Sequence, residues 1–183
     1  MSAAVVLSMH KKSAKNRDIV LDAFRTTDSV LLNNWQNQTQ DRQLALSYSF
    51  PVSDTTTKEW LDARLHRLEK FPTSVYWAIR DLQGGLFGYT VLASIDYLNE
   101  NAEIGIYLGF GRKGGIGSRA LELTLHNAFN QLHLRKVTAR IIDVNSAALA
   151  LFTKFNFRQE GELVDHIKID NDWHNLILLS RMR

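Results

Sequence analysis

The sequence predicts an α/β protein of the α+β type, in which helices flank a mixed central sheet of about seven strands. Three observations lead to this prediction. The elements follow the order strand, two helices, three strands, helix, strand, helix and two strands. Short turn sequences separate the three consecutive strands, as in an antiparallel meander. Two further strands close the chain, so the pattern is that of a mixed sheet with helices on both faces rather than a doubly wound parallel sheet.

Two helices are predicted before the meander. The first strand is expected at Ile19–Arg25, and Asp28 can cap a helix that continues to about Asn37. The polar segment Gln36–Ser49 shows no clear pattern. A second helix is expected over about Thr56–Lys70, because apolar residues recur there at helical spacing. Those apolar residues are Trp60, Leu61, Leu65 and Leu68.

The meander is marked by alternation and by turn residues. Val75–Arg80 alternates apolar and polar side chains, and Gln83-Gly84-Gly85 is a turn signal before the partner strand Leu86–Ile95. The second turn is Asn99-Glu100-Asn101, and the third strand is Ala102–Leu108. These spacings predict three antiparallel strands in sequence order.

The second half begins with the clearest helix, Gly117–Leu132, and continues with the strand Lys136–Ile142 and the short helix Ser146–Lys154. Two strands, Arg158–Ile169 and Leu176–Met182, are predicted to close the fold. One face of the long helix is apolar, as a helix on a sheet requires. That face consists of Leu121, Leu125, Ala128, Phe129 and Leu132.

Length and composition indicate one globular domain. The chain has 183 residues, 45% of them hydrophobic and 22% charged, with a formal net charge of +3. Residues 1–16 are expected to form a loosely ordered tail, and residues 17–183 the domain. The basic residues are scattered, which argues against nucleic-acid binding. No apolar run reaches the roughly 20 residues that span a bilayer, so no membrane association is expected.

The chain contains no cysteine, which excludes disulfides, a thiolate nucleophile and cysteine-bound zinc. A cytoplasmic location is expected, since a reducing compartment suits such a chain. The six histidines are dispersed, so no metal site is predicted. His166 and His174 lie on the last two strands and would come close if these strands pair.

A glycine-rich loop lies between the third meander strand and the long helix. It reads Arg112-Lys113-Gly114-Gly115-Ile116-Gly117-Ser118. Glycines allow close backbone approach and positive φ, and a helix N-terminus with free N–H groups binds anions. With Arg112 and Lys113 beside it, the loop is suited to a diphosphate. A tight structural turn is the alternative, and the loop is neither a Walker A loop nor a Rossmann fingerprint.

Three segments in order resemble the Gcn5-related N-acetyltransferase (GNAT) superfamily over residues 17–183. Arg112, Gly115 and Gly117 match its cofactor loop Arg/Gln-x-x-Gly-x-Gly/Ala, and Ala102–Tyr107 looks like its fourth strand. Asn145–Phe157 is similar to its Asn-x-x-Ala-x-x-x-Tyr-x-Lys-x-Gly-Phe segment. The C-terminal part is similar to the Rim-type branch, which holds ribosomal-protein, polyamine and some nucleotide-sugar acetyltransferases. This part comprises Glu160–Leu163, Asp165-His166 and Trp173–Asn175.

The resemblance implies the GNAT fold, with strands 4 and 5 splayed apart, and acetyl-CoA as co-substrate. The splay after Glu103 would leave a cleft for the pantetheine arm, which pairs with the backbone of Ile106–Leu108. Asn145 would face the pantetheine. The expected cofactor-binding residues are Ile106, Tyr107, Leu108, Arg112, Lys113, Gly114, Gly115, Ile116, Gly117, Ser118, Asn145 and Phe152.

Acetyl transfer to an amine needs a base, because alkylammonium groups have a pKa near ~10. Glu103, on the strand that lines the cleft, is the candidate catalytic base; the alternative is a rim carboxylate paired with a basic side chain. Phe152 stands where the family has its tyrosine proton donor and is expected to be a packing residue. Tyr107 is a candidate substitute donor, but strand alternation alone does not say which face it occupies. Asn156 replaces the family glycine and tolerates left-handed backbone.

The expected function is direct transfer of an acetyl group to a primary amine in a ternary complex. The acceptor is a protein or peptide N-terminus, a polyamine or an amino sugar. A non-catalytic acetyl-CoA-binding regulatory module is the alternative, which Phe152 favours and Glu103 opposes. A third possibility is that the glycine-rich loop binds a phosphate-bearing ligand other than acetyl-CoA. The sequence also leaves open whether the protein forms a homodimer.

Overall fold

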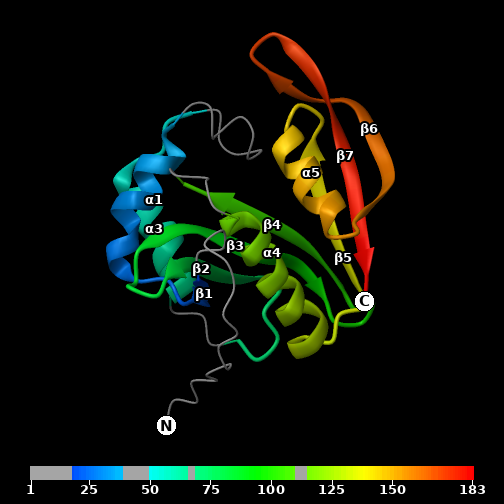
Figure 1. The fold of residues 1–183 in the computed structure, drawn as a ribbon. Coiled ribbons are helices and arrows are strands. Elements are labelled where there is room, and N and C mark those ends of the chain that lie inside the picture. Colours follow the sequence, from blue (N-terminus) through cyan, green and yellow to red (C-terminus); the bar gives the residue numbers. More distant parts are fainter. Residues whose placement is uncertain (1–17, 39–49, 66–68, 110–114) are drawn as a thin grey trace.

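The computed structural model describes residues 18–38, 50–65, 69–109 and 115–183, and its centre is a seven-stranded sheet in the order β1-β2-β3-β4-β5-β7-β6. Neighbouring strands are antiparallel except for the parallel pair β4–β5. The predicted mixed sheet of about seven strands is therefore confirmed (Figure 1). The strands are β1 (Ile19–Asp22), β2 (Val75–Asp81), β3 (Leu86–Asp96), β4 (Asn101–Leu108), β5 (Lys136–Ile142), β6 (Arg158–Ile169) and β7 (Asp172–Met182).

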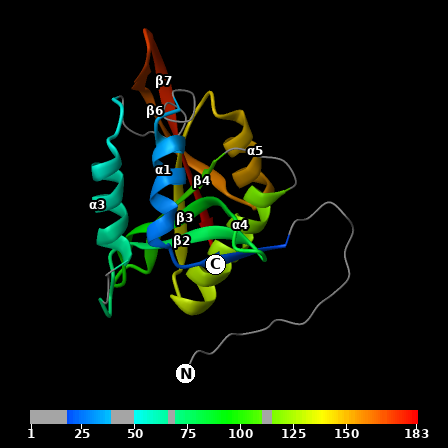
Figure 2. The same cartoon turned by 90° about the vertical axis from the view of Figure 1, so that its left-hand side faces the viewer.

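Helices cover both faces of this sheet. One face carries α1 (Ser29–Gln36) and α3 (Asp54–Leu65), and the other carries α4 (Ile116–His126) and α5 (Ser146–Lys154), as Figure 2 shows with the sheet between them. Strand alternation sends side chains to both layers. The core under α1 and α3 includes Phe24, Leu32, Trp35, Leu61 and Ala78, whereas the core under α4 and α5 includes Leu92, Ile104, Leu121, Leu125, Val137 and Phe152.

The long helix is interrupted by a wider turn. Of its predicted apolar face, Leu121, Leu125, Ala128 and Phe129 are buried and Leu132 is partly buried. The α-helix begins at Ile116 rather than Gly117 and ends at His126, and a π turn, η2 (Asn127–Gln131), follows. The N–H of Leu132 donates to the carbonyl oxygen of Asn127 at 2.9 Å, a five-residue step. The wider turn keeps the adjacent residues Ala128 and Phe129 both buried in the core.

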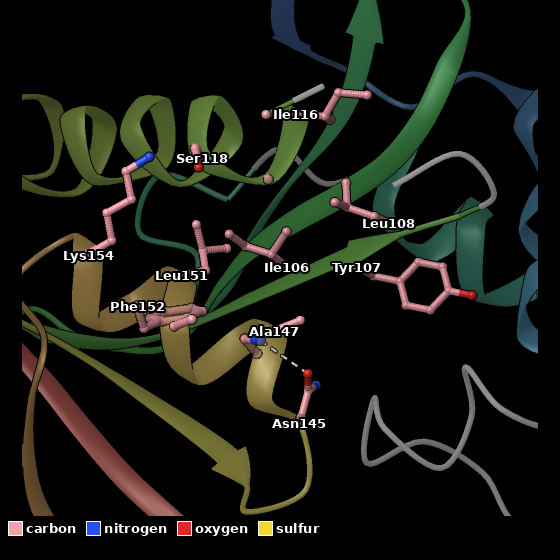
Figure 3. Close-up of a pocket in the computed structure, with 14 residues that line it drawn as sticks. Ile106, Tyr107, Leu108, Ile116, Ser118, Asn145, Ala147, Leu151, Phe152 and Lys154 are labelled. Carbon is pink, nitrogen blue, oxygen red and sulfur yellow. Dashed lines mark hydrogen bonds between the residues drawn. The ribbon is translucent and has the colours of Figure 1, made fainter. Parts of the chain in front are cut away.

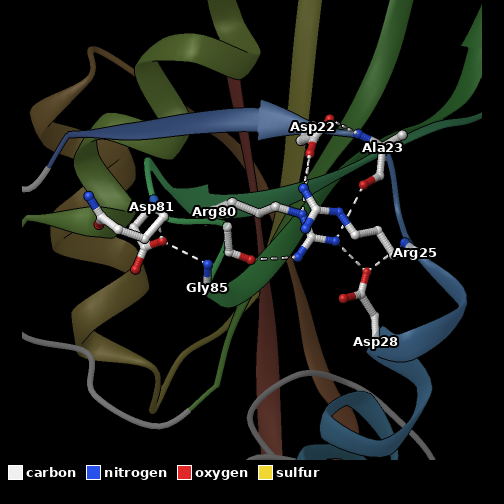
Figure 4. Close-up of polar contacts among 9 residues, drawn as sticks. Asp22, Ala23, Arg25, Asp28, Arg80, Asp81 and Gly85 are labelled. Carbon is white, nitrogen blue, oxygen red and sulfur yellow. Dashed lines mark hydrogen bonds and ion pairs between the residues drawn. The ribbon is translucent and has the colours of Figure 1, made fainter.

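The first strand ends earlier than predicted. The Asp22 carboxylate accepts from the N–H of Ala23 at 2.8 Å and ends β1 there. A short 3₁₀ turn, η1 (Thr26–Asp28), then leads into α1. Asp28 lies at the predicted N-cap position, but its side chain does not cap α1. Its carboxylate instead accepts from the N–H of Arg25 at 2.7 Å and pairs with Arg80 of β2 (Figure 4).

The closing hairpin is longer than the sequence predicts. β7 begins at Asp172 rather than at Leu176, because the chain turns sharply at Asp170, whose φ is 52°. The register of β6 against β7 shifts between Leu163 and Ile167, and Ile167 pairs with His174. The hairpin extends beyond the rest of the sheet (Figure 1).

Other boundaries differ by a few residues or lie outside the described residues. The second helix begins at Asp54 rather than Thr56 and is described as far as Leu65. Residues 66–68 are not described, and the predicted end at Lys70 is wrong, since Glu69 and Lys70 are not helical. Most of the unassigned polar segment, residues 39–49, and the predicted tail, residues 1–16, also lie outside the described part. None of the described helices is long and apolar enough to cross a membrane.

Candidate active site

The parallel ladder between β4 and β5 is short. It consists of Asn101 with Lys136, Ala102 with Val137, and Glu103 with Thr138. Beyond Glu103, β4 continues to pair with β3 as far as Leu108, whereas β5 continues to pair with β7. The two strands therefore separate after Glu103, and in the described part of the chain no strand pairs with this edge of β4. The predicted splay of strands 4 and 5 is confirmed.

A cavity of about 450 Å³ lies on the α4–α5 face of this gap. The end of β4 forms its floor, and the start of α4 and one side of α5 form its walls (Figure 3). Most of its lining is apolar. Of the predicted cofactor-binding residues, the cavity brings together Ile106, Tyr107, Leu108, Gly115, Ile116, Gly117, Ser118, Asn145 and Phe152.

The start of α4 has the backbone geometry that the glycine-rich loop predicted. Gly115 occupies the N-cap position with φ 78° and ψ 9°, a left-handed conformation that favours glycine. The first turn of α4 lines the cavity, and the free N–H groups at the start of a helix favour an anion. Arg112, Lys113 and Gly114, the remaining predicted loop residues, lie outside the described residues.

Helix α5 contributes both a capped start and a cation. The Asn145 side-chain oxygen accepts from the N–H of Ala148 at 3.1 Å and fixes the start of α5 at the cavity edge. Ala147, Leu151 and Lys154 follow at helical spacing and line the cavity. Figure 3 shows the Lys154 side chain extending toward Ser118 and the start of α4. Lys154 was not predicted as a binding residue, although its spacing from Ala147 and Leu151 could have indicated it.

A second cavity of about 520 Å³ lies at the same gap and includes Glu103. Five residues line both cavities, so the two spaces meet where β4 and β5 separate. These shared residues are Ile106, Tyr107, Asn145, Ala148 and Phe152. The second cavity is also lined by residues that sequence reasoning missed, because only strand register brings them together: Tyr89, Val91, Arg140 and Ile167.

Glu103 lies half-buried in the second cavity, beside Ala93 of β3 and Thr138 of β5. In the described part of the chain, no basic side chain forms an ion pair with it. The alternative that Glu103 is a rim carboxylate held by a basic partner therefore finds no support among these residues.

Tyr107 belongs to the aromatic cluster on the α1–α3 face. Its ring stacks on Tyr89 with 5.4 Å between centroids and lies 6.3 Å from the Trp35 ring. Figure 3 shows it directed away from Ile106 and Leu108. Its hydroxyl is buried and has no hydrogen-bond partner among the described residues. Burial raises the pKa of Tyr107 to about 12, with the nearby Tyr89 adding to the shift.

Phe152 is a packing residue, as expected. Its side chain is buried and meets Phe157 edge to face with 4.9 Å between ring centroids. The turn after α5 also has the predicted geometry, because Asn156 has a φ of 62° in place of a glycine.

The end of β5 is tied to the closing hairpin. His174 Nδ1 lies 3.2 Å from the Asp143 carboxylate, and Asn175 N–H donates to the same carboxylate at 3.0 Å. Hydrogen bonding, chiefly from the backbone of Asn175, holds the pKa of Asp143 below its usual range. The described partner of His174 is thus Asp143, and on β6 the residue opposite His174 is Ile167. Within the described ranges, no three His, Asp or Glu side chains are placed to hold a metal ion.

Comparison with known proteins agrees with this geometry. The family model described as "Acetyltransferase (GNAT) domain" matches residues 18–158. The chain belongs to the GNAT acetyltransferase family. Within this family, the chain is 26% identical over 101 residues to a spermidine N(1)-acetyltransferase of Vibrio cholerae, covering 55% of this chain and 58% of that protein. It is 28% identical over 98 residues to the Escherichia coli spermidine N(1)-acetyltransferase, covering 53% of each.

The chain spans little more than half the length of these curated relatives. Over the whole fold, it is similar to the crystal structure of spermidine N-acetyltransferase from Vibrio cholerae in complex with CoA and spermine. The TM-score is 0.80 at 21% identity, covering 90% of this chain and 95% of that one. This likeness shows that the GNAT domain has the fold expected from its sequence.

Proposed function

We propose that this GNAT protein transfers the acetyl group of acetyl-CoA to a primary amine in a ternary complex. The observation that carries this proposal is the junction of the two cavities between β4 and β5, with Glu103 in one of them. Two substrates can approach this junction from separate spaces. The thioester carbonyl of acetyl-CoA supplies the activated acyl group when it is bound.

The residues of the first cavity fit this group. The open backbone edge of Ile106–Leu108 offers hydrogen bonds like those of an added strand. The first-turn N–H groups of Gly115–Ser118 and the Lys154 ammonium are suited to phosphates. Apolar side chains, Phe152 among them, exclude water near the junction. Arg112, Lys113 and Gly114 remain binding residues predicted from the sequence.

In the second cavity, Glu103 accepts a proton from the acceptor ammonium, which makes the amine nucleophilic. Its half-buried carboxylate has no basic partner among the described residues, so it is free to face an amine. The Tyr107 hydroxyl, which lies on the α1–α3 face of the sheet, can donate a hydrogen bond to the acceptor substrate. Phe152 has no proton to give, and solvent protonates the leaving thiolate.

Within the family, we propose that the chain belongs to the Rim-type branch. Two of the residues that carry this resemblance form hydrogen bonds of the hairpin: the Asn175 side chain donates to the Glu162 carboxylate within the hairpin, and the Asn175 backbone N–H donates to Asp143, just after β5. Its acceptor is then a protein or peptide N-terminus, a polyamine or an amino sugar.

The test is thiol release from acetyl-CoA with a panel of primary amines, using wild type and Glu103→Gln. We expect release with at least one amine, and a loss of about 10²-fold or more in kcat for Glu103→Gln with little change in the Kd for acetyl-CoA. Binding of acetyl-CoA without release for any amine would support the regulatory module that Phe152 favours. If nucleotides displace acetyl-CoA and bind at least as tightly as it does, the first cavity would instead hold another phosphate-bearing ligand.

A further inference from the structure

The second cavity contains a cation opposite Glu103. Thr138 pairs with Glu103 across the β4–β5 ladder, and Arg140 is two residues further along β5. Because side chains alternate along a strand, Arg140 projects from the same face of the sheet as Thr138 and Glu103. Arg140 is exposed and lines this cavity together with Glu103.

The charge of Arg140 is not neutralised by the described residues. No carboxylate among them pairs with it, whereas Arg80, Arg25 and Arg119 each have an aspartate or glutamate partner. On β7, the residue opposite Arg140 is the apolar Leu178. Glu103 and Arg140 are the two charged side chains of the cavity lining, which therefore presents one carboxylate and one guanidinium.

This lining is poorly suited to a polycation. A diamine or polyamine that placed one amine at Glu103 would bring a further positive charge near the Arg140 guanidinium, and like charges in a partly desolvated space repel. A guanidinium is instead the side chain that binds carboxylate and phosphate in bidentate geometry. Two residues of strand rise and one strand spacing separate the two Cα atoms by about 8 Å or more, so both ends of a short acceptor can be contacted.

We propose that Arg140 selects an acceptor amine that also carries an anionic group, a carboxylate or a phosphate. The amine lies at Glu103 on β4, and the anion lies at Arg140 on β5, across the gap where the strands separate. This proposal rests on the proposed function and names the acceptor class of the same site. Under this proposal, the acceptor of this chain differs in charge from that of the relatives named for spermidine, because spermidine is a polycation.

The test uses acceptors that share a four-carbon skeleton and differ in the charge at the far end: 4-aminobutanoate, butylamine and 1,4-diaminobutane. We expect kcat/KM to fall in that order in the wild type, by about tenfold from the anionic to the cationic acceptor. Arg140→Gln should remove this preference. Its kcat/KM for butylamine, which has no charge at the far end, should stay within about twofold of the wild-type value. Arg140→Glu should reverse the order. 3-Aminopropyl phosphate, compared with 4-aminobutanoate, distinguishes phosphate from carboxylate.

Arg158→Gln is the matched control, since Arg158 is also exposed but lies on the edge strand β6 and lines neither cavity. Equal kcat/KM for the three acceptors in the wild type, or the same ratios in Arg140→Gln and wild type, would overturn the proposal. Isothermal titration calorimetry gives the Kd of 4-aminobutanoate and of 1,4-diaminobutane, and this measurement does not depend on acetyl transfer. If no amine releases thiol, a binding preference that Arg140→Gln removes still supports Arg140, while the proposed function fails.

Discussion

Arg80 and Asp28 form an ion pair in which both side chains are buried, with 2.5 Å between Nη2 of the arginine and Oδ2 of the aspartate. The pair joins β2 to the turn before α1. Arg80 also donates to the carbonyl oxygen of Gly84 at 3.2 Å, and its Nε lies 3.4 Å from the Asp22 carboxylate (Figure 4). The pair thus anchors the segment that leads into α1, which covers the aromatic cluster beside the second cavity.

Breaking this pair should be strongly destabilising. Asp28→Ala removes the buried partner of the Arg80 guanidinium and leaves only the more exposed Asp22 carboxylate at 3.4 Å, so the free energy of unfolding should fall by about 3 kcal/mol in urea denaturation. The double variant Asp28→Leu/Arg80→Met should recover a large part of this loss. Glu122→Ala is the control, because it breaks the exposed Arg119–Glu122 pair and should change stability by less than about 1 kcal/mol. A loss for Asp28→Ala no larger than the control would show that the buried pair is not an anchor.

Gly109 allows helix α1 to approach the end of β4. A Cβ at this position would lie 2.1 Å from a ring carbon of Trp35. Gly109→Ala should therefore displace Trp35 and lower the free energy of unfolding by about 1–3 kcal/mol. In Gly109→Ala/Trp35→Phe, the smaller ring should recover part of the loss.

Gly117→Ala serves as the control for Gly109→Ala, since its Cβ would meet its nearest neighbours at 3.4 and 3.5 Å, ordinary contact distances. Thermal unfolding of both variants compares them directly. Equal unfolding temperatures for Gly109→Ala and Gly117→Ala would show that the close approach of Trp35 to Gly109 does not cause the loss of stability.

Tyr107 should make stability depend on pH in the alkaline range. Its pKa is raised to about 12 in the folded protein, from 10 for an ordinary tyrosine, mainly by burial. The unfolded chain therefore loses this proton first, and the stabilisation present below pH 10 declines as the pH rises from 10 to 12. Tyr107→Phe should show a smaller decline in unfolding free energy over this range than the wild type.

At pH 8, Tyr107→Phe should be no less stable than the wild type, because it removes a buried hydroxyl that has no partner among the described residues. Tyr76→Phe is the comparison, since the Tyr76 hydroxyl accepts from Arg64 at 3.2 Å. A marked loss of stability at pH 8 in Tyr107→Phe would indicate a hydrogen bond that this geometry does not contain.

Lys154 should contribute to acetyl-CoA binding through charge. Lys154→Gln should raise the Kd for acetyl-CoA about three- to tenfold at low salt, equivalent to roughly 0.7–1.4 kcal/mol. The difference from wild type should shrink at high ionic strength. Lys58→Gln, an exposed lysine on α3 that lines neither cavity, is the control. Equal Kd values for the two variants would remove Lys154 from the binding site.

Local patterns in the sequence predicted much of the fold. Turn residues and alternation located β2, β3 and β4, and the glycine loop indicated the left-handed Gly115 at the start of α4. These features depend on a few adjacent residues. Asp28 shows where such reasoning fails, because a sound local capping signal was overridden by Arg80, 52 residues away.

The candidate site was only half predictable for the same reason. Residues of one motif, such as Glu103, Ile106 and Asn145, were identified by the segments to which they belong. Arg140 and Tyr89 enter the second cavity only through the register of neighbouring strands, and the face occupied by Tyr107 depends on the packing of Trp35. No short-range pattern contains this information.

The three-pair ladder between β4 and β5 also bears on how such a protein can diversify. The start of α4 and the α5 residues Leu151 and Lys154 line one cavity alone, whereas Tyr89, Val91, Glu103 and Arg140 line only the other. Under the proposed function, substitutions in the second group can therefore change which amine is accepted and leave the binding of acetyl-CoA unchanged. The five shared residues do not have this freedom, so variation between relatives should be least at the junction and greatest on the acceptor side.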